Sequence, residues 1–222
     1  MSTLVKLNGV GLTYGSGATA VVAVHDATFS IVQHESLAIT GASGSGKSSL
    51  LHLIAGLETP TRGTVVWPGL GGRPGADPTQ VGVMFQAPSL IPSLDALENV
   101  ALPLLIAGQG ESEARTAAHG ALELLELDWA ATLLPEQLSG GQAQRIALAR
   151  VLVMRPRIVV ADEPTGQLDL ATADHVLDTL LGVVAEIGAA VVVSTHDAHV
   201  AARFDGELVL RGGSIVKEKL TA

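Results

Sequence analysis

The chain has 222 residues, enough to bury the core of one domain with room for an inserted subdomain. Its formal net charge is −9, and its 13 lysines and arginines form no basic run, so we expect no nucleic-acid partner. The absence of cysteine excludes disulfides and thiolate metal sites, which suits a reducing compartment. Aliphatic residues dominate and helical and strand-like segments alternate, which predicts an α/β fold.

No segment is predicted to enter or cross a membrane. The first residues, MSTLVKLNGVG, lack the apolar core of a secretory signal. The longest apolar candidate, residues 100–107, is interrupted by Pro103 and is much shorter than the roughly 18 residues of a membrane helix. We therefore expect a chain that is soluble by itself, with any membrane spans supplied by another polypeptide.

Two β-rich segments, 4–10 and 21–32, are predicted around a glycine-containing loop, GSGATA. Tyr14, the only tyrosine, stands just before this loop. Two interpretations stay open for its ring. It is either a half-buried strand aromatic or a flat surface that stacks on a nucleobase.

A phosphate-binding loop is predicted at residues 41–48. The sequence GASGSGKS matches the pattern G-x-x-x-x-G-K-[ST] between an apolar run and a helix-like segment, SSLLHLIAGL. Glycines let backbone N–H groups turn toward a polyanion, and the start of the helix adds the positive end of its dipole. The lysine would reach the β- and γ-phosphates, and the next hydroxyl would help to hold Mg²⁺. The residues predicted to bind ATP here are Gly41, Ala42, Ser43, Gly44, Ser45, Gly46, Lys47, Ser48 and Ser49.

The middle of the chain predicts a strand and then a helical block. The apolar run VGVMFQ reads as a strand that Gln86 closes, where its amide could lie near Mg²⁺ or an attacking water, although a lone glutamine there is usually an edge residue. From about residue 93 to 138 the apolar residues recur at helical spacing. Because no flexible linker flanks this block, we interpret it as an inserted helical subdomain and not as a separate domain.

A second possible anion site follows, where Ser139, Gly140 and Gly141 open a helix predicted to run to about Met154. A helix cap alone explains this pattern. One chain would nevertheless have two phosphate-binding helix starts and a single lysine-bearing loop. A dimer resolves this mismatch, because the second helix start would then close over a nucleotide held by the partner.

Charged side chains end two further buried strands. The run IVVADE ends in Asp162, suited to contact Mg²⁺, and Glu163, placed to polarise a water beside the γ-phosphate. The run AAVVVSTHDAH ends near His196, which could donate a hydrogen bond to the γ-phosphate. A metal site made by His196 and His199 is the rival interpretation, although no third ligand is evident. The last runs, ELVL and SIVKE, predict a hairpin about Gly212 and Gly213.

Taken in order, these segments resemble the nucleotide-binding subunit of an ABC (ATP-binding cassette) transporter over essentially the whole length. LSGGQ just before the aspartate–glutamate strand, with Gln86 and His196 in order, is far more specific than the phosphate loop alone. The motifs that carry the resemblance are the aromatic loop at Tyr14, Walker A at 41–48, the Q-loop at Gln86, LSGGQ at 138–142, Walker B at 159–163, the D-loop QLD at 167–169 and the switch histidine His196.

The resemblance implies a P-loop NTPase of the ABC-cassette fold, with a mixed β core, a RecA-like subdomain and an inserted helical subdomain. Residues 1–222 would form one ABC ATPase domain, in which about 88–155 make up the helical subdomain that carries LSGGQ. The activity implied is ATP hydrolysis coupled to transport.

The resemblance also implies roles for single residues. Two cassettes would pack head to tail as a homodimer, with each ATP between Walker A of one subunit and Leu138, Ser139, Gly140, Gly141 and Gln142 of the other. The remaining roles implied are adenine stacking by Tyr14, phosphate binding by Lys47, Mg²⁺ coordination by Ser48, Gln86 and Asp162, catalysis by Glu163, His196 and Gln86, and a contact across the dimer by Asp169.

The subfamily resemblance rests on residues 89–108 and 161–169, which are similar to the small cassettes of lipoprotein release, macrolide export and cell division. It implies a separate integral membrane permease with few spans and a peripheral location at the cytoplasmic face of the cell membrane, and it allows for an extracytoplasmic accessory protein. Residues 88–100 would border the groove for the permease, although a core-facing role is equally open. Two mild departures are Gln167, where asparagine is more usual, and Ser49, where threonine is.

Three other functions are compatible with parts of the sequence. An amino-acid importer cassette shares much of the pattern. A soluble ABC ATPase is the second class; the acidic balance and the absence of a long coiled coil or a second cassette count against action on nucleic acid or ribosomes. A stand-alone cassette for iron–sulfur cluster assembly stays open, because the length of the chain does not exclude it. A catalytically dead regulatory cassette is disfavoured because Glu163, His196 and LSGGQ are all present.

Overall fold

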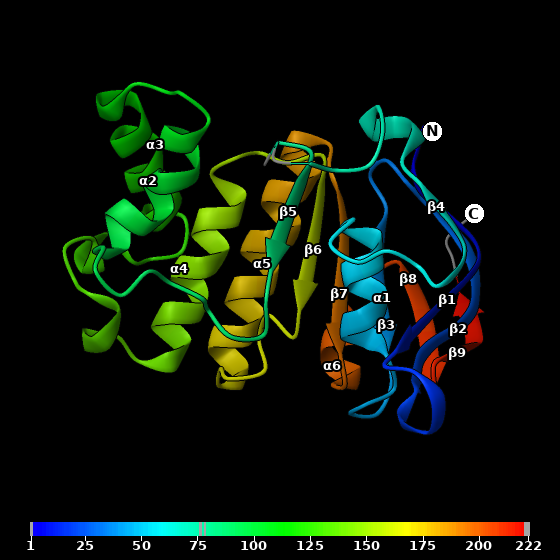
Figure 1. Ribbon diagram of the computed structural model, residues 1–222. Coiled ribbons are helices and arrows are strands. Elements are labelled where there is room, and N and C mark those ends of the chain that lie inside the picture. The colour runs from blue at the N-terminus through cyan, green and yellow to red at the C-terminus, as the bar shows by residue number, and fades with distance from the viewer. Residues whose placement is uncertain (1, 76, 78, 220–222) are drawn as a thin grey trace.

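The computed structural model describes residues 2–75, 77 and 79–219. Two β-sheets are stacked with helices between and beside them (Figure 1). The strands are β1 (Thr3–Tyr14), β2 (Val21–Val32), β3 (Ser36–Thr40), β4 (Arg62–Val66), β5 (Val81–Met84), β6 (Ile158–Asp162), β7 (Ala190–Thr195), β8 (Gly206–Arg211) and β9 (Ser214–Lys219). The α-helices are α1 (Lys47–Ile54), α2 (Ala96–Ile106), α3 (Glu111–Glu123), α4 (Gly140–Leu152), α5 (Leu170–Ile187) and α6 (Ala198–Ala201). Short 3₁₀ helices are η1 (Gly17–Thr19), η2 (Pro68–Leu70), η3 (Asp128–Ala130) and η4 (Pro135–Gln137).

The larger sheet has six strands in the order β5-β6-β7-β3-β8-β9. All neighbouring strands are parallel except the last pair, β8 and β9, which form the predicted hairpin. Every residue of β6 and β7 is buried, which explains the apolar runs 158–161 and 190–193. The registers pair Thr40 with Thr195 and Asp162 with Ser194, so the loops after β3, β6 and β7 leave from the same edge of the sheet.

Side chains alternate between the two faces of this sheet and thereby join two different cores. Val159 and Ala161 of β6 pack with the helices α2, α3, α4 and α5. Ile158 and Val160 of the same strand pack instead with α1 and the smaller sheet. The helical block therefore has no core of its own, because its apolar residues are continuous with one face of the large sheet.

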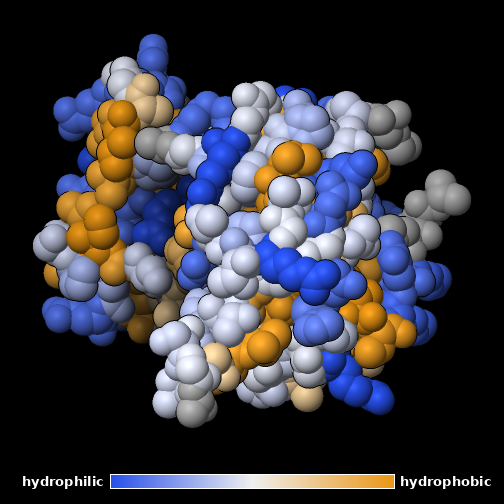
Figure 2. All heavy atoms as spheres, turned by 45° about the vertical axis from the view of Figure 1, so that its right-hand side comes forward, coloured by the Kyte–Doolittle hydropathy of each residue, from blue (hydrophilic) through white to orange (hydrophobic). Residues whose placement is uncertain are grey.

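The smaller sheet is antiparallel, in the order β2-β1-β4, and covers the α1 side of the molecule. Trp67 connects it to α1, since its indole Nε1 donates to the carbonyl of Ile54 at 2.8 Å. On the face that carries this sheet, hydrophilic side chains are interspersed with small hydrophobic patches (Figure 2). Among the described residues, no helix combines the length and the apolar character that crossing a membrane requires.

The segment before α2 is held by one buried amide. Asn99 is fully buried, and its Oδ1 accepts from the backbone N–H of Ile91 at 2.8 Å. Its Nδ2 donates to the carbonyls of Ile91, Leu94 and Asp95. Asp95 in turn caps α2 in a reciprocal pair with Glu98. Residues 91–95 are thus fastened to the first turn of α2 by side chains and not by regular secondary structure.

Replacing Asn99 with alanine should lower the free energy of unfolding by roughly 2 kcal/mol, because buried backbone groups lose their partners. Urea unfolding followed by circular dichroism measures this loss. The matched control is Asn8→Ala, at an exposed position on β1, which should stay within about 0.5 kcal/mol of the parent. Equal effects of the two substitutions would show that the Asn99 hydrogen bonds contribute nothing.

Candidate functional site

The predicted phosphate loop connects the end of β3 to the start of α1. Gly41, Gly44 and Gly46 have φ angles of 151°, 75° and 101°, in a region that favours glycine. A Cβ on Gly46 would lie 2.0 Å from the carbonyl oxygen of Ala23, and one on Gly41 would lie 2.4 Å from that of Leu210. Both glycines are therefore required by close backbone approach as well as by conformation.

Lys47 follows this loop in the first turn of α1 and is almost fully buried. Its Nζ donates to the carbonyls of Gly41 at 2.9 Å and Ala42 at 3.3 Å, so the side chain folds back over the loop. The same Nζ lies 3.8 Å from Oε1 of Glu163. The cation thus sits between the phosphate loop and the end of β6.

The two carboxylates predicted at the end of β6 lie in different surroundings. Asp162 is buried and accepts a hydrogen bond from the hydroxyl of Ser194 on β7. The backbone N–H of Glu163 donates to both the hydroxyl (3.1 Å) and the carbonyl (3.2 Å) of Ser194. Ser194 is fully buried and had no place in the sequence-based site. Its only signal was a polar residue at the end of an otherwise apolar strand.

Glu163 has a left-handed backbone, with φ of 48°, a conformation that costs energy for residues other than glycine and recurs at active sites. Its carboxylate contacts Lys47 through Oε1 and His196 through Oε2, which is 3.1 Å from Nδ1 of the ring. The carboxylate is 18% exposed and the His196 side chain is 65% exposed. Strands β3, β6 and β7 therefore bring a cation, a carboxylate and an imidazole together at one edge of the sheet.

The rival metal interpretation places the second histidine elsewhere. His199 lies on α6, and its Nε2 is 2.8 Å from Oδ1 of Asp174 on α5. Arg203 contacts the same carboxylate. Within the described ranges, no group of three or more His, Cys, Asp or Glu side chains could hold a metal ion.

Two predicted residues lie at the margins of the site. Tyr14 ends β1 with its ring partly exposed, and its Oη is 3.4 Å from Oγ of Ser49 in the first turn of α1. Gln86 was expected to close a strand, but β5 ends at Met84, whose partner Ala161 is one residue before the end of β6. Gln86 is therefore exposed in the loop beyond the strand.

The oxygen donors at this edge suit a magnesium ion. Ser48, Gln86 and Asp162 supply a hydroxyl, an amide carbonyl and a carboxylate, the hard ligands that Mg²⁺ prefers. A set with one carboxylate also matches a site in which phosphates and water complete the coordination.

The LSGGQ segment lies apart from this site. Ser139 caps α4 in a reciprocal pair with Gln142, and Ser139 and Gly140 are exposed. In Figure 1, α4 and α1 are on opposite sides of β5 and β6. The chain does, however, place LSGGQ next to the D-loop. A Cβ on Gly140 would lie 3.0 Å from Oε1 of Gln167, and one on Gly141 would lie 2.8 Å from Leu168.

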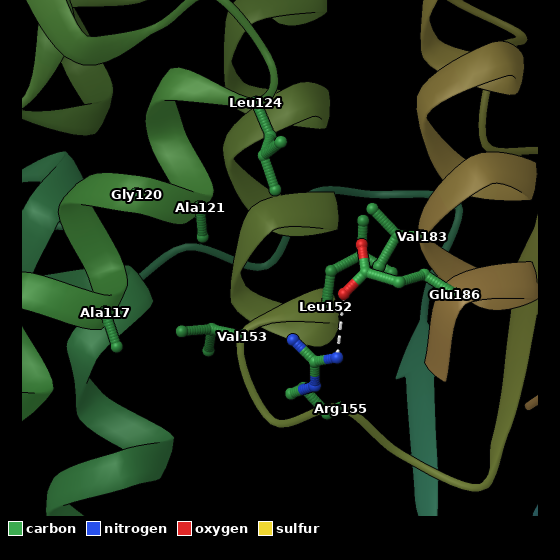
Figure 3. A pocket seen from close by; sticks show the side chains of 9 residues that line it. All are labelled: Ala117, Gly120, Ala121, Leu124, Leu152, Val153, Arg155, Val183 and Glu186. Atoms are coloured by element: carbon green, nitrogen blue, oxygen red, sulfur yellow. Dashed lines mark hydrogen bonds and ion pairs between the residues drawn. The ribbon is translucent and has the colours of Figure 1, made fainter. Parts of the chain in front are cut away.

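A cavity of about 420 Å³ opens between α3, the end of α4 and α5 (Figure 3). Its walls are mainly apolar, from side chains such as Ala121, Leu124 and Val183. The charged residues that line it, Arg155 and Glu186, form an ion pair with each other at 2.9 Å. No set of free polar groups converges on it from the described residues that form its walls, so it lacks the means for phosphate chemistry.

Comparison with known proteins identifies the family of this chain. Residues 24–166 match the family model described as ABC transporter. A protein described as "Lipoprotein-releasing system ATP-binding protein LolD" from Shewanella denitrificans is 39% identical over 217 residues, which cover 95% of this chain and 93% of that protein. A protein of the same description from Bordetella pertussis is 40% identical over 216 residues, with coverages of 93% and 92%.

Two solved structures of the cassette MJ0796 are also similar. One is described as a dimeric bacterial ABC transporter cassette and the other as a dimeric post-hydrolysis state bound to ADP and Pi. Each is 37% identical, with a TM-score of 0.91 over 98% of both chains. These similarities confirm the fold class and the family predicted from the sequence. The chain belongs to the ABC transporter family and is an ATP-binding subunit that hydrolyses ATP.

Proposed function

We propose that this ATPase works as a head-to-tail homodimer that drives a separate membrane permease of the lipoprotein-release type. The proposed catalytic role rests mainly on the position of Glu163. Its carboxylate lies between Lys47 and His196, at the sheet edge that also bears the phosphate loop. We assign stacking on the adenine to Tyr14 and binding of the phosphates to residues 41–49. The catalytic roles are assigned to Glu163, His196 and Gln86.

Hydrolysis would proceed by in-line attack of water on the γ-phosphorus. The water oxygen forms the new bond to phosphorus, the bond to the ADP oxygen breaks, and Glu163 accepts the proton of the water. Because Nδ1 faces Glu163, Nε2 is the His196 nitrogen that would carry a proton and donate a hydrogen bond to a γ-phosphate oxygen. Ser48, Gln86 and Asp162 would hold Mg²⁺, which neutralises phosphate charge when bound.

The dimer is proposed because the helix start at Ser139 faces solvent across β5 and β6 from α1. An exposed helix N-terminus with two glycines suits an anion that another molecule brings. The solved relatives described as dimeric are consistent with this arrangement. In it, residues 138–142 of one subunit cover the ATP of the other, and Asp169 lies at the contact.

The permease is proposed from the relatives named for lipoprotein release. Such a partner would place this chain at the cytoplasmic face of the membrane, peripherally, and could include an extracytoplasmic accessory protein. Residues 88–100 are the proposed contact, and Asn99 fastens their part 91–95 to the first turn of α2. About 88–155 remains the proposed extent of the helical subdomain.

Replacing Glu163 with glutamine should retain ATP binding and reduce turnover at least a hundredfold, because general-base catalysis typically contributes about 10²–10⁴-fold. With ATP and Mg²⁺ the variant should accumulate as a dimer, measured by sedimentation velocity. Lys47→Ala is the contrasting variant, since it should lose ATP affinity and stay monomeric. Unchanged turnover in Glu163→Gln would remove Glu163 from the role of base.

Ser194→Ala should lower kcat about tenfold and change the KM for ATP by less than about threefold, because a hydrogen bond to a charged group contributes about 1.5–3 kcal/mol. Ser194 acts as a positioning residue for Asp162 and Glu163. Steady-state ATPase assays measure both constants. Ser36 provides the matched control, since its hydroxyl also donates to a carboxylate and accepts from a backbone N–H, both of Asp205, at the opposite edge of the sheet. If Ser36→Ala reduced kcat as much, the effect would be one of general stability.

The permease is tested by capturing tagged Glu163→Gln protein from its native cells with ATP present, followed by mass spectrometry. A membrane protein with few spans and a large external domain is the expected partner. A many-span permease with a binding protein would favour the amino-acid importer alternative. Soluble partners alone would contradict the transport role of the proposed complex.

A further inference from the structure

A cavity of about 430 Å³ lies beside the phosphate loop, on the side of β8. It is lined by residues 41–45 of the loop and by 209–212 at the end of β8. Among the described residues that form its walls, the loop contributes neither Lys47 nor Ser48. The cavity is therefore a neighbour of the predicted phosphate position and not that position itself.

Arg211 gives this cavity a positive charge. It is the last residue of β8, just before the turn at Gly212 and Gly213, and its side chain is exposed. No carboxylate in the described part of the chain forms an ion pair with it. The turn itself is fixed against the phosphate loop, because the N–H of Gly213 donates to the carbonyl of Ser45 at 2.9 Å. Arg211 is thus an unpaired cation on a rigid support in an acidic protein.

Asp169 carries the opposite charge to Arg211 and is also exposed. It caps α5, where Oδ1 accepts from the N–H of Thr172 at 3.1 Å and Oδ2 accepts from its hydroxyl at 2.6 Å. These hydrogen bonds from Thr172 lower the pKa of the Asp169 carboxyl, so it is ionised at neutral pH. A carboxylate has further lone pairs to offer, and the next residue, Leu170, is an exposed leucine, 62% accessible. An exposed charge beside an exposed apolar side chain suits a surface that a partner covers.

Contacts within one subunit determine where Asp169 lies relative to the LSGGQ segment. Gln167 and Leu168 lie directly against Gly140 and Gly141. Asp169 follows Leu168 directly, so a subunit that brings Ser139–Gly141 to its partner's phosphate loop would also bring Asp169 close to that loop. The flank on the β8 side carries the cavity and Arg211.

We propose that, in the ATP-bound dimer, Arg211 receives the partner's Asp169 in the cavity beside the phosphate loop, as an intersubunit ion pair. The pair would form twice in a symmetric dimer, since each subunit supplies one Arg211 and one Asp169. It would favour the head-to-tail arrangement over other associations of two acidic chains. This inference rests on the proposed dimer.

The test is a double-mutant cycle in the Glu163→Gln protein, with ATP and Mg²⁺ present. Arg211→Glu should raise the dissociation constant of the dimer about tenfold, as measured by sedimentation velocity over a range of protein concentrations. Adding Asp169→Asn, which removes the charge and keeps a capping side chain, should restore the constant to within about threefold of the Asp169→Asn variant alone. The tenfold difference should shrink at about 1 M salt, where the Debye length is near 3 Å.

Arg115→Glu is the matched control, because it makes the same change in net charge at an exposed position on α3. ATP affinity of each variant is measured by equilibrium dialysis with radiolabelled ATP at protein concentrations too low for dimers. If the Glu163→Gln parent forms a dimer and Arg211→Glu leaves its dissociation constant unchanged, the ion pair is overturned but the dimer is not. The pair is also overturned if Arg115→Glu has the same effect, if Asp169→Asn gives no relief, or if the loss of ATP affinity accounts for the weaker dimer. A parent that stays monomeric with bound ATP would overturn the proposed dimer itself.

Discussion

The alignment of three strand ends determines where the charged groups of the site lie. Thr40 pairs with Thr195 and Asp162 pairs with Ser194, so Lys47, Glu163 and His196 all follow strands that stop at one level. A shift of β6 by one residue would turn its side chains to the other face of the sheet. The contacts of Glu163 with Lys47 at 3.8 Å and with His196 at 3.1 Å exist only in the observed register.

Packing, and not the ion pairs, holds that register. Burying a valine or isoleucine side chain contributes about 1.5–3 kcal/mol, and β6 places such residues in both cores, Val159 in one and Val160 in the other. A partly exposed ion pair such as Glu163 with His196 contributes at most about 1 kcal/mol. Because apolar residues of β6 packed in both cores hold the register, the charged groups at the strand ends are not needed for stability and can serve nucleotide chemistry.

The sequence allowed prediction of those parts of the site whose residue types have few other uses. GASGSGKS and LSGGQ are such patterns, and the fold and family that they indicated are confirmed. Ser194 could not be predicted, because a single serine after three valines has many ordinary roles. The strand predicted to reach Gln86 is shorter, since β5 ends at Met84 opposite Ala161 although β6 continues to Asp162. The contact between the D-loop and LSGGQ joins segments that are far apart in the sequence, which no local pattern reveals.

The short segment from Glu163 to Asp169 connects two surfaces that the fold otherwise separates. At one end, a Cβ on Gly166 would come 3.3 Å from Oε2 of Glu163. At the other, Gln167 and Leu168 abut the glycines that open α4. The D-loop thus lies near the Glu163 carboxylate on one side and against the start of α4 on the other. The proposed attachment of Asp169 to a second subunit would therefore act on Glu163 through a path of only a few residues.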